Sequence, residues 1–236
     1  MKAYIINLDS RNDRWRDLQP SLKRLNFLEF SRISAVSYSD FGFISSKFTT
    51  PGVTATWASH QKAYKLFLQT EDEYALIFED DFQFRKSDVS RIQQISQFPG
   101  FDFLQLGFLK VSPLKSLKIF FDNSFDYFLR FLSIITAFRL FSHSFLSRKI
   151  MLIERRNLPH YLVVNRVMEG GHAYLISRRF AQAMLEANSP AFLSTDGFFM
   201  AISWMRTFRM ARTRRSLFSQ SNSPSSVPKR VLLEAD

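Results

Sequence analysis

The chain has 236 residues, a formal net charge of +11 and no cysteine. The lack of cysteine excludes a disulfide framework and a thiolate–zinc site, and a hydrophobic content of 46% excludes a disordered chain. The positive charge favours acidic partners, namely nucleotide phosphates, anionic lipid headgroups or nucleic acid. The length predicts one domain with room for a sizeable core.

The first predicted strand covers residues 3–8 and is apolar throughout, as expected of a strand buried on both faces. It is too short for a signal peptide, and Asp9 and Arg11 follow at once. A helix is predicted to about residue 25, with Asp9 or Ser10 as its N-cap. Arg11 and Arg14, in its first turn, either hold an anion or form a solvated face. No segment of the chain approaches the roughly 20 apolar residues of a membrane-spanning helix.

Strands and helices are predicted to alternate over the first half of the chain. Residues 30–36 and 101–107 have the pattern of strands, residues 54–69 and 89–98 that of helices, and residues 37–53 that of a loop. With a further strand at residues 74–78, this order predicts an α/β fold whose mainly parallel sheet is flanked by helices.

Three carboxylates, Glu79, Asp80 and Asp81, directly follow the apolar strand at residues 74–78. Ionised carboxylates are costly to bury, so we expect them just beyond the carboxyl end of the strand, where ligands bind in open α/β sheets. Oxygen ligands at this spacing suit Mg²⁺ or Mn²⁺, which also contact substrate phosphates. The pattern therefore predicts a metal–diphosphate site; the alternative is a solvated acidic turn.

A Phe-rich segment at residues 110–165 interrupts the alternation of strands and helices. Its apolar residues recur at helical intervals from about position 115 to position 150, with Asp, Arg and Ser between them, which predicts one or two amphipathic helices. Their apolar stripe either packs on the domain core or meets a membrane interface or lipid-linked acceptor, where arginine and lysine would contact anionic headgroups.

The last third of the chain contains further candidates for chemistry. Residues 169–177 combine a Gly pair and His172 with a short strand, and residues 178–187 continue as a helix. Residues 189–197 are predicted to form a turn that presents Asp196. The basic run at residues 206–215 is either a solvated segment or an anion contact. We place the domain at residues 1–216 and an irregular Ser- and Pro-rich tail at 217–236.

Taken in order, these motifs resemble glycosyltransferase family 25, which includes lipooligosaccharide β-galactosyltransferases of bacteria and the related collagen galactosyltransferases. The matching stretches cover most of the chain outside residues 110–165, and they are residues 4–9 with Asp13 and Arg14, 33–36, Ser59-His60 with Tyr64, 74–81, 103–107, 171–177 and Thr195-Asp196. The family usually has a Gly-rich, often Cys-containing stretch before its Ser-His pair, whereas residues 53–58 here read Val-Thr-Ala-Thr-Trp-Ala.

The resemblance implies a GT-A-like, Rossmann-like fold, a nucleotide-sugar donor and a divalent metal. It places Asp81 as a ligand of Mn²⁺ or Mg²⁺, Glu79 near the metal or the ribose, Asp80 in support of either role, and His172 as a third metal ligand or an acceptor contact. The nucleotide pocket would be lined by the first strand end and its neighbours, which are Asn7, Leu8, Asp9, Arg14 and His60.

The resemblance also implies transfer of a galactose-like hexose, from a UDP-linked donor, with inversion at the anomeric centre. Inversion needs a carboxylate base that takes a proton from the acceptor hydroxyl; we expect Asp196 in that role, with Glu169 as the second candidate. The acceptor would be a cell-surface glycan or a lipid-linked precursor, reached from the cytoplasm or from the inner face of the membrane. An inactive sugar- or membrane-binding relative is the alternative, and a nucleic-acid-binding protein, suggested by charge alone, ranks last.

Overall fold

A computed structural model describes residues 1–41, 49–97, 100–109, 161–164, 166–187, 191, 193–205 and 207–221 of the chain. The Phe-rich insertion predicted at residues 110–165 lies outside the described residues up to position 160. Near its end, Leu162–Val164 forms strand β6 rather than a helix. Of the predicted tail, residues 222–236 also lie outside the described part.

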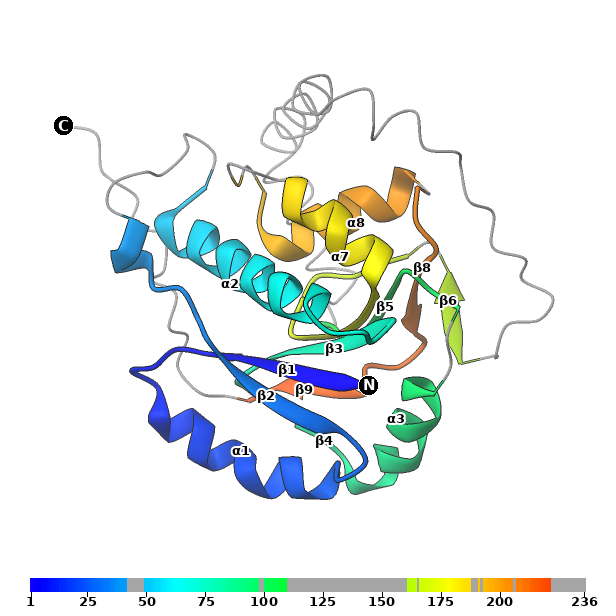
Figure 1. Cartoon of the computed structure of the whole chain (residues 1–236). Coiled ribbons are helices and arrows are strands. Elements are labelled where there is room, and N and C mark those ends of the chain that lie inside the picture. The colour runs from blue at the N-terminus through cyan, green and yellow to red at the C-terminus, as the bar shows by residue number, and fades with distance from the viewer. Residues whose placement is uncertain are drawn as a thin grey trace, which may run out of the picture.

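The described strands form one mixed sheet in the order β2-β1-β3-β7-β5-β8-β6, with β9 paired to β5 and to β4 (Figure 1). Strands β1, β2, β3, β5, β8 and β9 point one way, and β4, β6 and β7 point the other way. The α/β prediction is therefore confirmed, with antiparallel β7 inserted between β3 and β5. The strand bounds are Lys2–Asn7, Glu29–Ser34, Tyr74–Glu79, Phe82–Phe84, Phe103–Gly107, Leu162–Val164, Ala173–Ser177, Met210–Thr213 and Phe218–Gln220 for β1 to β9.

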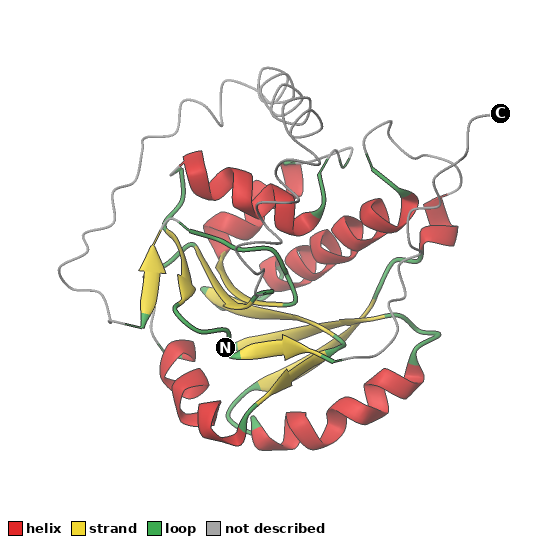
Figure 2. Ribbon diagram, turned by 180° about the vertical axis from the view of Figure 1, so that it is seen from behind, coloured by secondary structure: helices red, strands yellow, loops and turns green. Residues whose placement is uncertain are grey.

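Helices cover both faces of this sheet (Figures 1 and 2). Helices α1 (Asn12–Arg24) and α3 (Val89–Ser96) pack on one face, and α2 (Pro51–Leu68), α7 (Arg178–Glu186) and α8 (Thr195–Met205) pack on the other. Two single-turn 3-10 helices, η1 (Tyr38–Phe41) and η2 (Lys86–Asp88), complete the described elements.

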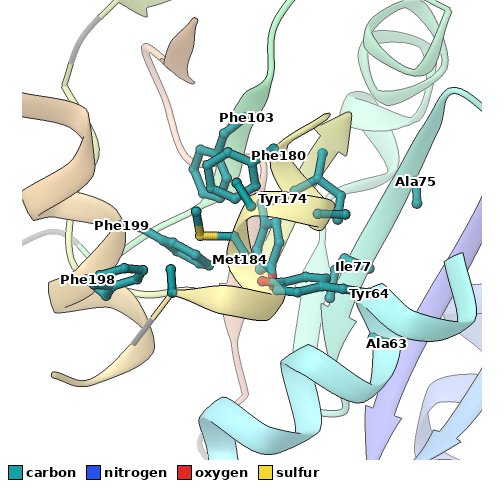
Figure 3. Packing of buried hydrophobic residues seen from close by; sticks show 14 of the residues in the cluster. Ala63, Tyr64, Ala75, Ile77, Phe103, Tyr174, Phe180, Met184, Phe198 and Phe199 are labelled. Atoms are coloured by element: carbon teal, nitrogen blue, oxygen red, sulfur yellow. The ribbon is translucent and has the colours of Figure 1, made fainter. Parts of the chain in front are cut away.

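The core is divided by the sheet into two clusters, because successive strand residues point to opposite faces. Tyr4 and Ile6 of β1 pack with α2, α7 and α8, whereas Ala3 and Ile5 pack with α1 and α3. Figure 3 shows the first cluster, in which Tyr64 of α2 and Tyr174 of β7 meet among phenylalanine rings.

Two expectations about local structure are wrong. Neither Asp9 nor Ser10 caps α1, whose N-cap residue Arg11 makes no capping hydrogen bond with its side chain; Asp9 instead accepts a hydrogen bond from Ser34 on the neighbouring strand. The domain boundary placed at residue 216 is too early, since β9 joins the sheet beyond it. The basic run at residues 206–215, predicted to be either a solvated segment or an anion contact, contains strand β8, which pairs with β5 and β6.

Candidate active site

The carboxylate motif lies at the edge of the sheet where β1 and β3 end side by side. The two strands are parallel, with Ile6 opposite Glu79, so the chain after β1 and the chain after β3 start at the same edge. Glu79 is the last residue of β3, and Asp80 and Asp81 form the turn into β4.

Asp80 is the most enclosed member of the motif, with 8% of its surface exposed. One carboxylate oxygen accepts a hydrogen bond of 2.6 Å from the Asn7 amide, and the other pairs with the Arg14 guanidinium at 2.7 Å. The Asn7 side-chain oxygen in turn accepts from Arg32 at 2.8 Å. Arg14 is itself buried, so it is not part of a solvated face. The charge of Asp80 is therefore compensated within the protein, and it ties β3 to β1 and α1.

Asp81 lies next to this network without sharing its hydrogen bonds. Its Oδ1 atom is buried and has no hydrogen-bond partner, and Arg14 approaches its Oδ2 atom only to 4.0 Å. Burial raises the pKa of Asp81 to about 7, helped by the charges of Glu79 and Asp80 and opposed by that of Arg14. When Asp81 is ionised, its nearest cation, Arg14, is therefore too far away to form a hydrogen bond with it.

Glu79 keeps 27% of its side chain exposed at the mouth of the site. Burial raises the pKa of Glu79, but the neighbouring His60 imidazole and the charge of Arg14 lower it by more, and the net shift is downward. The His60 Nε2 atom lies 3.5 Å from Glu79 Oε1. Glu79 is therefore ionised at neutral pH and open to a ligand.

These two carboxylates fit a hard divalent cation that takes part of its coordination from a substrate. Within the described residues, no group of three or more His, Cys, Asp or Glu side chains could hold a metal ion by itself. Mg²⁺ and Mn²⁺ sites of phosphate-transferring proteins need only one or two carboxylates, because substrate phosphates and water supply the other ligands. The unpartnered oxygen of Asp81 supplies one such ligand position.

His172, expected as a further ligand, lies buried behind the motif. Its Nε2 atom donates to the carbonyl oxygen of Phe218 in β9 at 3.1 Å, and burial lowers its pKa. Gly107 of β5 packs against its ring so closely that an added Cβ would stand 2.4 Å from Nε2. The contacts of His172 therefore fix it to β5 and β9.

A cleft of about 120 Å³ opens beside the motif, between the ends of β1 and β2 and the first turns of α2. Five residues expected to bind the nucleotide-sugar donor line it, namely Leu8, Arg14, His60, Glu79 and Asp80. The α2 wall is built from small side chains, which leaves room for a ligand: Gly52, Ala55, Thr56 and Ser59.

Other cleft residues were not predicted from the sequence. Val36 and Tyr38 line the cleft, and Tyr38 has half of its surface exposed. Ser59 fixes this side of the cleft by accepting a hydrogen bond from the Val36 amide at 2.8 Å. Asn7 supports the cleft floor through Asp80, whereas Asp9 is bonded to Ser34 and Arg32 and does not line the cleft.

The second group of candidates, Glu169 and Asp196, is connected to the motif by the loop at residues 169–172. The backbone amide of Glu79 donates to the carbonyl oxygen of His172 at 2.9 Å, and the amide of Gly170 donates to the Asp196 carboxylate at 3.3 Å. Gly170 has a φ of 103°, a conformation that glycine adopts readily. Asp196 does not lie on a turn, as predicted, but in the first turn of α8.

Comparison with known protein families places this arrangement among glycosyltransferases. The model of glycosyltransferase family 25 (LPS biosynthesis protein) matches residues 1–199, which include β1, the cleft, the carboxylate motif and Asp196. A search of individually curated proteins gave no significant match. None of the helices in the described part of the chain has the length and apolar character to cross a bilayer. The match extends over well more than half of the chain, and the chain therefore belongs to glycosyltransferase family 25.

Proposed function

We propose that this chain is a metal-dependent glycosyltransferase with a GT-A-like fold. It would transfer a galactose-like hexose from a nucleotide-sugar, UDP-linked, to a cell-surface glycan or a lipid-linked precursor, with inversion. The observation that carries the proposal is a cleft lined by Glu79 and Asp80, directly followed in the chain by Asp81, whose buried Oδ1 atom has no hydrogen-bond partner. A cation held there would satisfy this oxygen and lie next to a diphosphate in the cleft.

Glu79 and Asp81 would hold Mn²⁺ or Mg²⁺ in this proposal. The bound ion would stabilise the negative charge that develops on the departing nucleoside diphosphate. Arg14 pairs with Asp80 at 2.7 Å and approaches Asp81 to 4.0 Å, so its role would be to hold the motif. His172 is left out of the ligand set because no group of three His, Cys, Asp or Glu side chains among the described residues could hold a metal ion.

Asp196 would act as the base that takes the proton from the acceptor hydroxyl. The amides of Gly170 and Gly197 donate to its two oxygens at 3.3 and 2.9 Å, so the carboxylate is held in one orientation. The loop at residues 169–172 links Asp196 to Glu79, because its Gly170 amide donates to Asp196 and its His172 carbonyl oxygen accepts from the Glu79 amide. Glu169, on the same loop, is the second candidate.

The proposal is tested by incubating the protein with a panel of nucleotide-sugars, in Mn²⁺ or in chelator, and measuring nucleoside diphosphate release. We expect metal-dependent release from one donor. Asp81→Asn should lower Mn²⁺ affinity by at least tenfold and abolish release. Asp196→Asn should bind the donor normally and lose transfer, typically by a factor of about 100 or more. Asp13→Asn, which removes an exposed carboxylate bonded to Arg11, is the matched control.

Three outcomes would contradict the proposal. Unchanged Mn²⁺ affinity in Asp81→Asn, measured by calorimetry, would remove the metal assignment, and near-normal transfer by Asp196→Asn would place the base elsewhere. If no donor stabilises the protein against thermal unfolding and none is cleaved, the inactive sugar- or membrane-binding relative becomes the better description.

A further inference from the structure

Behind Glu79, three buried side chains form a continuous hydrogen-bonded row. The Tyr64 hydroxyl of α2 lies 2.7 Å from the Tyr174 hydroxyl of β7, which lies 2.5 Å from Nδ1 of His60. All three side chains are fully buried, and Figure 3 shows the two tyrosine rings pointing toward each other from α2 and β7. On the far side of the His60 ring, Nε2 faces Glu79 Oε1 at 3.5 Å.

The direction of these hydrogen bonds follows from counting protons. Each phenol carries one proton, and burial raises the pKa of both tyrosines, so both stay protonated at neutral pH. Among the described residues, the only hydrogen-bond partner of the Tyr64 hydroxyl is Tyr174. Tyr64 must therefore donate, because the reverse direction would leave its proton unpaired in the core at a cost of about 1–3 kcal/mol.

The second hydrogen bond is then fixed by the first. The Tyr174 oxygen accepts from Tyr64, so its own proton is directed to the other neighbour, Nδ1 of His60. A ring nitrogen that accepts carries no proton, and the proton of the neutral imidazole is on Nε2. In this structure Nε2 makes no hydrogen bond, and the polar group that it faces is the Glu79 carboxylate, 3.5 Å away.

We infer that the Tyr64–Tyr174 pair holds His60 in the Nε2-protonated tautomer, so that His60 donates to Glu79 and orients this carboxylate at the cleft. Tyr64, Tyr174 and His60 are thus positioning residues, and they act through Glu79. A hydrogen bond to a metal-binding carboxylate from behind is a common way to fix its orientation. The role of Glu79 at the donor rests on the proposed function, whereas the tautomer of His60 does not.

The tautomer is measured directly by nitrogen NMR of protein with isotopically labelled histidine. The chain has four histidines, and the signals lost in His60→Gln assign those of His60. We expect a protonated Nε2 and an unprotonated, hydrogen-bonded Nδ1 in the wild type. Tyr174→Phe removes the donor to Nδ1 and should give a mixture of tautomers. Tyr4→Phe, which removes a hydroxyl from the same core cluster, should leave the signals of His60 unchanged.

The consequence for Glu79 is measured as Mn²⁺ affinity in the presence of the donor. Tyr174→Phe should weaken it by about tenfold, while Tyr4→Phe should not change it. A proton on Nδ1 of His60 in the wild type would overturn the inference, as would an unchanged tautomer and affinity in Tyr174→Phe. If Tyr174→Phe does not fold, the wild-type tautomer decides by itself, and Tyr64→Phe should keep it, because His60 Nδ1 is then the one remaining partner for the Tyr174 proton among the described residues. A protein that cleaves no donor but shows the expected tautomer refutes the proposed function alone.

Discussion

In the folded protein the pKa of Asp81 is raised to about 7, because burial and the charges of Glu79 and Asp80 oppose its ionisation. In the unfolded chain it has its ordinary value near 3.8. Between these two values the folded state binds the extra proton, so the free energy of unfolding falls as pH rises through this window. Asp81→Asn removes the titration. In the absence of metal, the free energy of unfolding of Asp81→Asn relative to that of the wild type should rise by roughly 1–3 kcal/mol as the pH goes from about 5 to about 8.

This comparison is made by urea unfolding in chelator at the two pH values. Asp13→Asn is the control, because its hydrogen bond to Arg11 lowers the pKa of Asp13 to about 2; the difference between that variant and the wild type should not change over this pH range. If Asp81→Asn and the wild type change in parallel, the Asp81 carboxylate is well compensated in solution, and it would no longer be the ligand that lacks a counter-charge.

The sequence predicts which residues of the site follow strands, but not how they are paired. Glu79, Asp80 and Asp81 stand out because three acids end an apolar run. The split between them, with Asp80 neutralised by Arg14 and Asp81 left without a partner, depends on contacts across 66 residues and more. The hydrogen bond of Tyr174 to His60 spans 114 residues, and no local pattern marks Tyr174 as anything other than a core residue.

Strand β9 shows why the short elements were missed. Its three residues, Phe218–Gln220, have no strand pattern of their own, and they are held by β4 and β5. The long strands β1, β3, β5 and β7 were predicted because their apolar runs are buried on both faces. In β8 the sequence Met-Ala-Arg-Thr looks basic and polar, but Arg212 lies over the Phe108 ring at 5.0 Å, and its charge does not keep the strand in solvent.

Phe218 is the residue through which β9 is expected to stabilise the site. It is fully buried, and its ring centroid lies 5.1, 5.6 and 5.7 Å from those of Phe78, Phe82 and Phe84. Its carbonyl oxygen holds His172, and Ser221 just beyond the strand donates to the Asp81 carbonyl at 2.6 Å. Phe218→Ala should therefore lower the free energy of unfolding by about 3–5 kcal/mol.

Urea denaturation measures this loss, with Ser219→Ala as the control, since Ser219 is the exposed neighbour on the same strand. The control should stay within about 0.5 kcal/mol of the wild type. A loss below about 1 kcal/mol in Phe218→Ala would mean that β9 is not packed on the sheet, and the domain would then end near residue 216 as the sequence predicted.

The molecule carries a net charge of +11, and part of this charge gathers on a second surface, away from the cleft. A hollow of about 180 Å³ is lined by Arg91, Arg214 and Arg215 together with Tyr161. Burial lowers the pKa of the neighbouring Arg212, and the charges of Arg166 and Arg214 lower it further, so the guanidinium groups repel one another. Asp88 is buried and paired with Arg215. The surface therefore favours anionic phosphate groups.

We propose that this arginine surface meets the anionic inner face of a membrane, where a lipid-linked acceptor would be reached. The double variant Arg166→Gln/Arg214→Gln removes two exposed charges and keeps the Arg215–Asp88 pair. Each basic residue near an anionic surface contributes about 1 kcal/mol, so partition into phosphatidylglycerol vesicles should fall roughly 10- to 30-fold. Binding should also weaken with added salt, because screening shortens the reach of the charges.

The control is Arg16→Gln/Arg24→Gln, which removes the same charge from exposed positions of α1. Vesicle co-sedimentation should show little change in this variant, and both variants should keep the wild-type unfolding temperature, since all four side chains are exposed. An equal loss in the two variants would mean that net charge alone attracts the protein. No binding by the wild type at low salt would remove the membrane from the proposed function, and the acceptor would then be sought among soluble glycans.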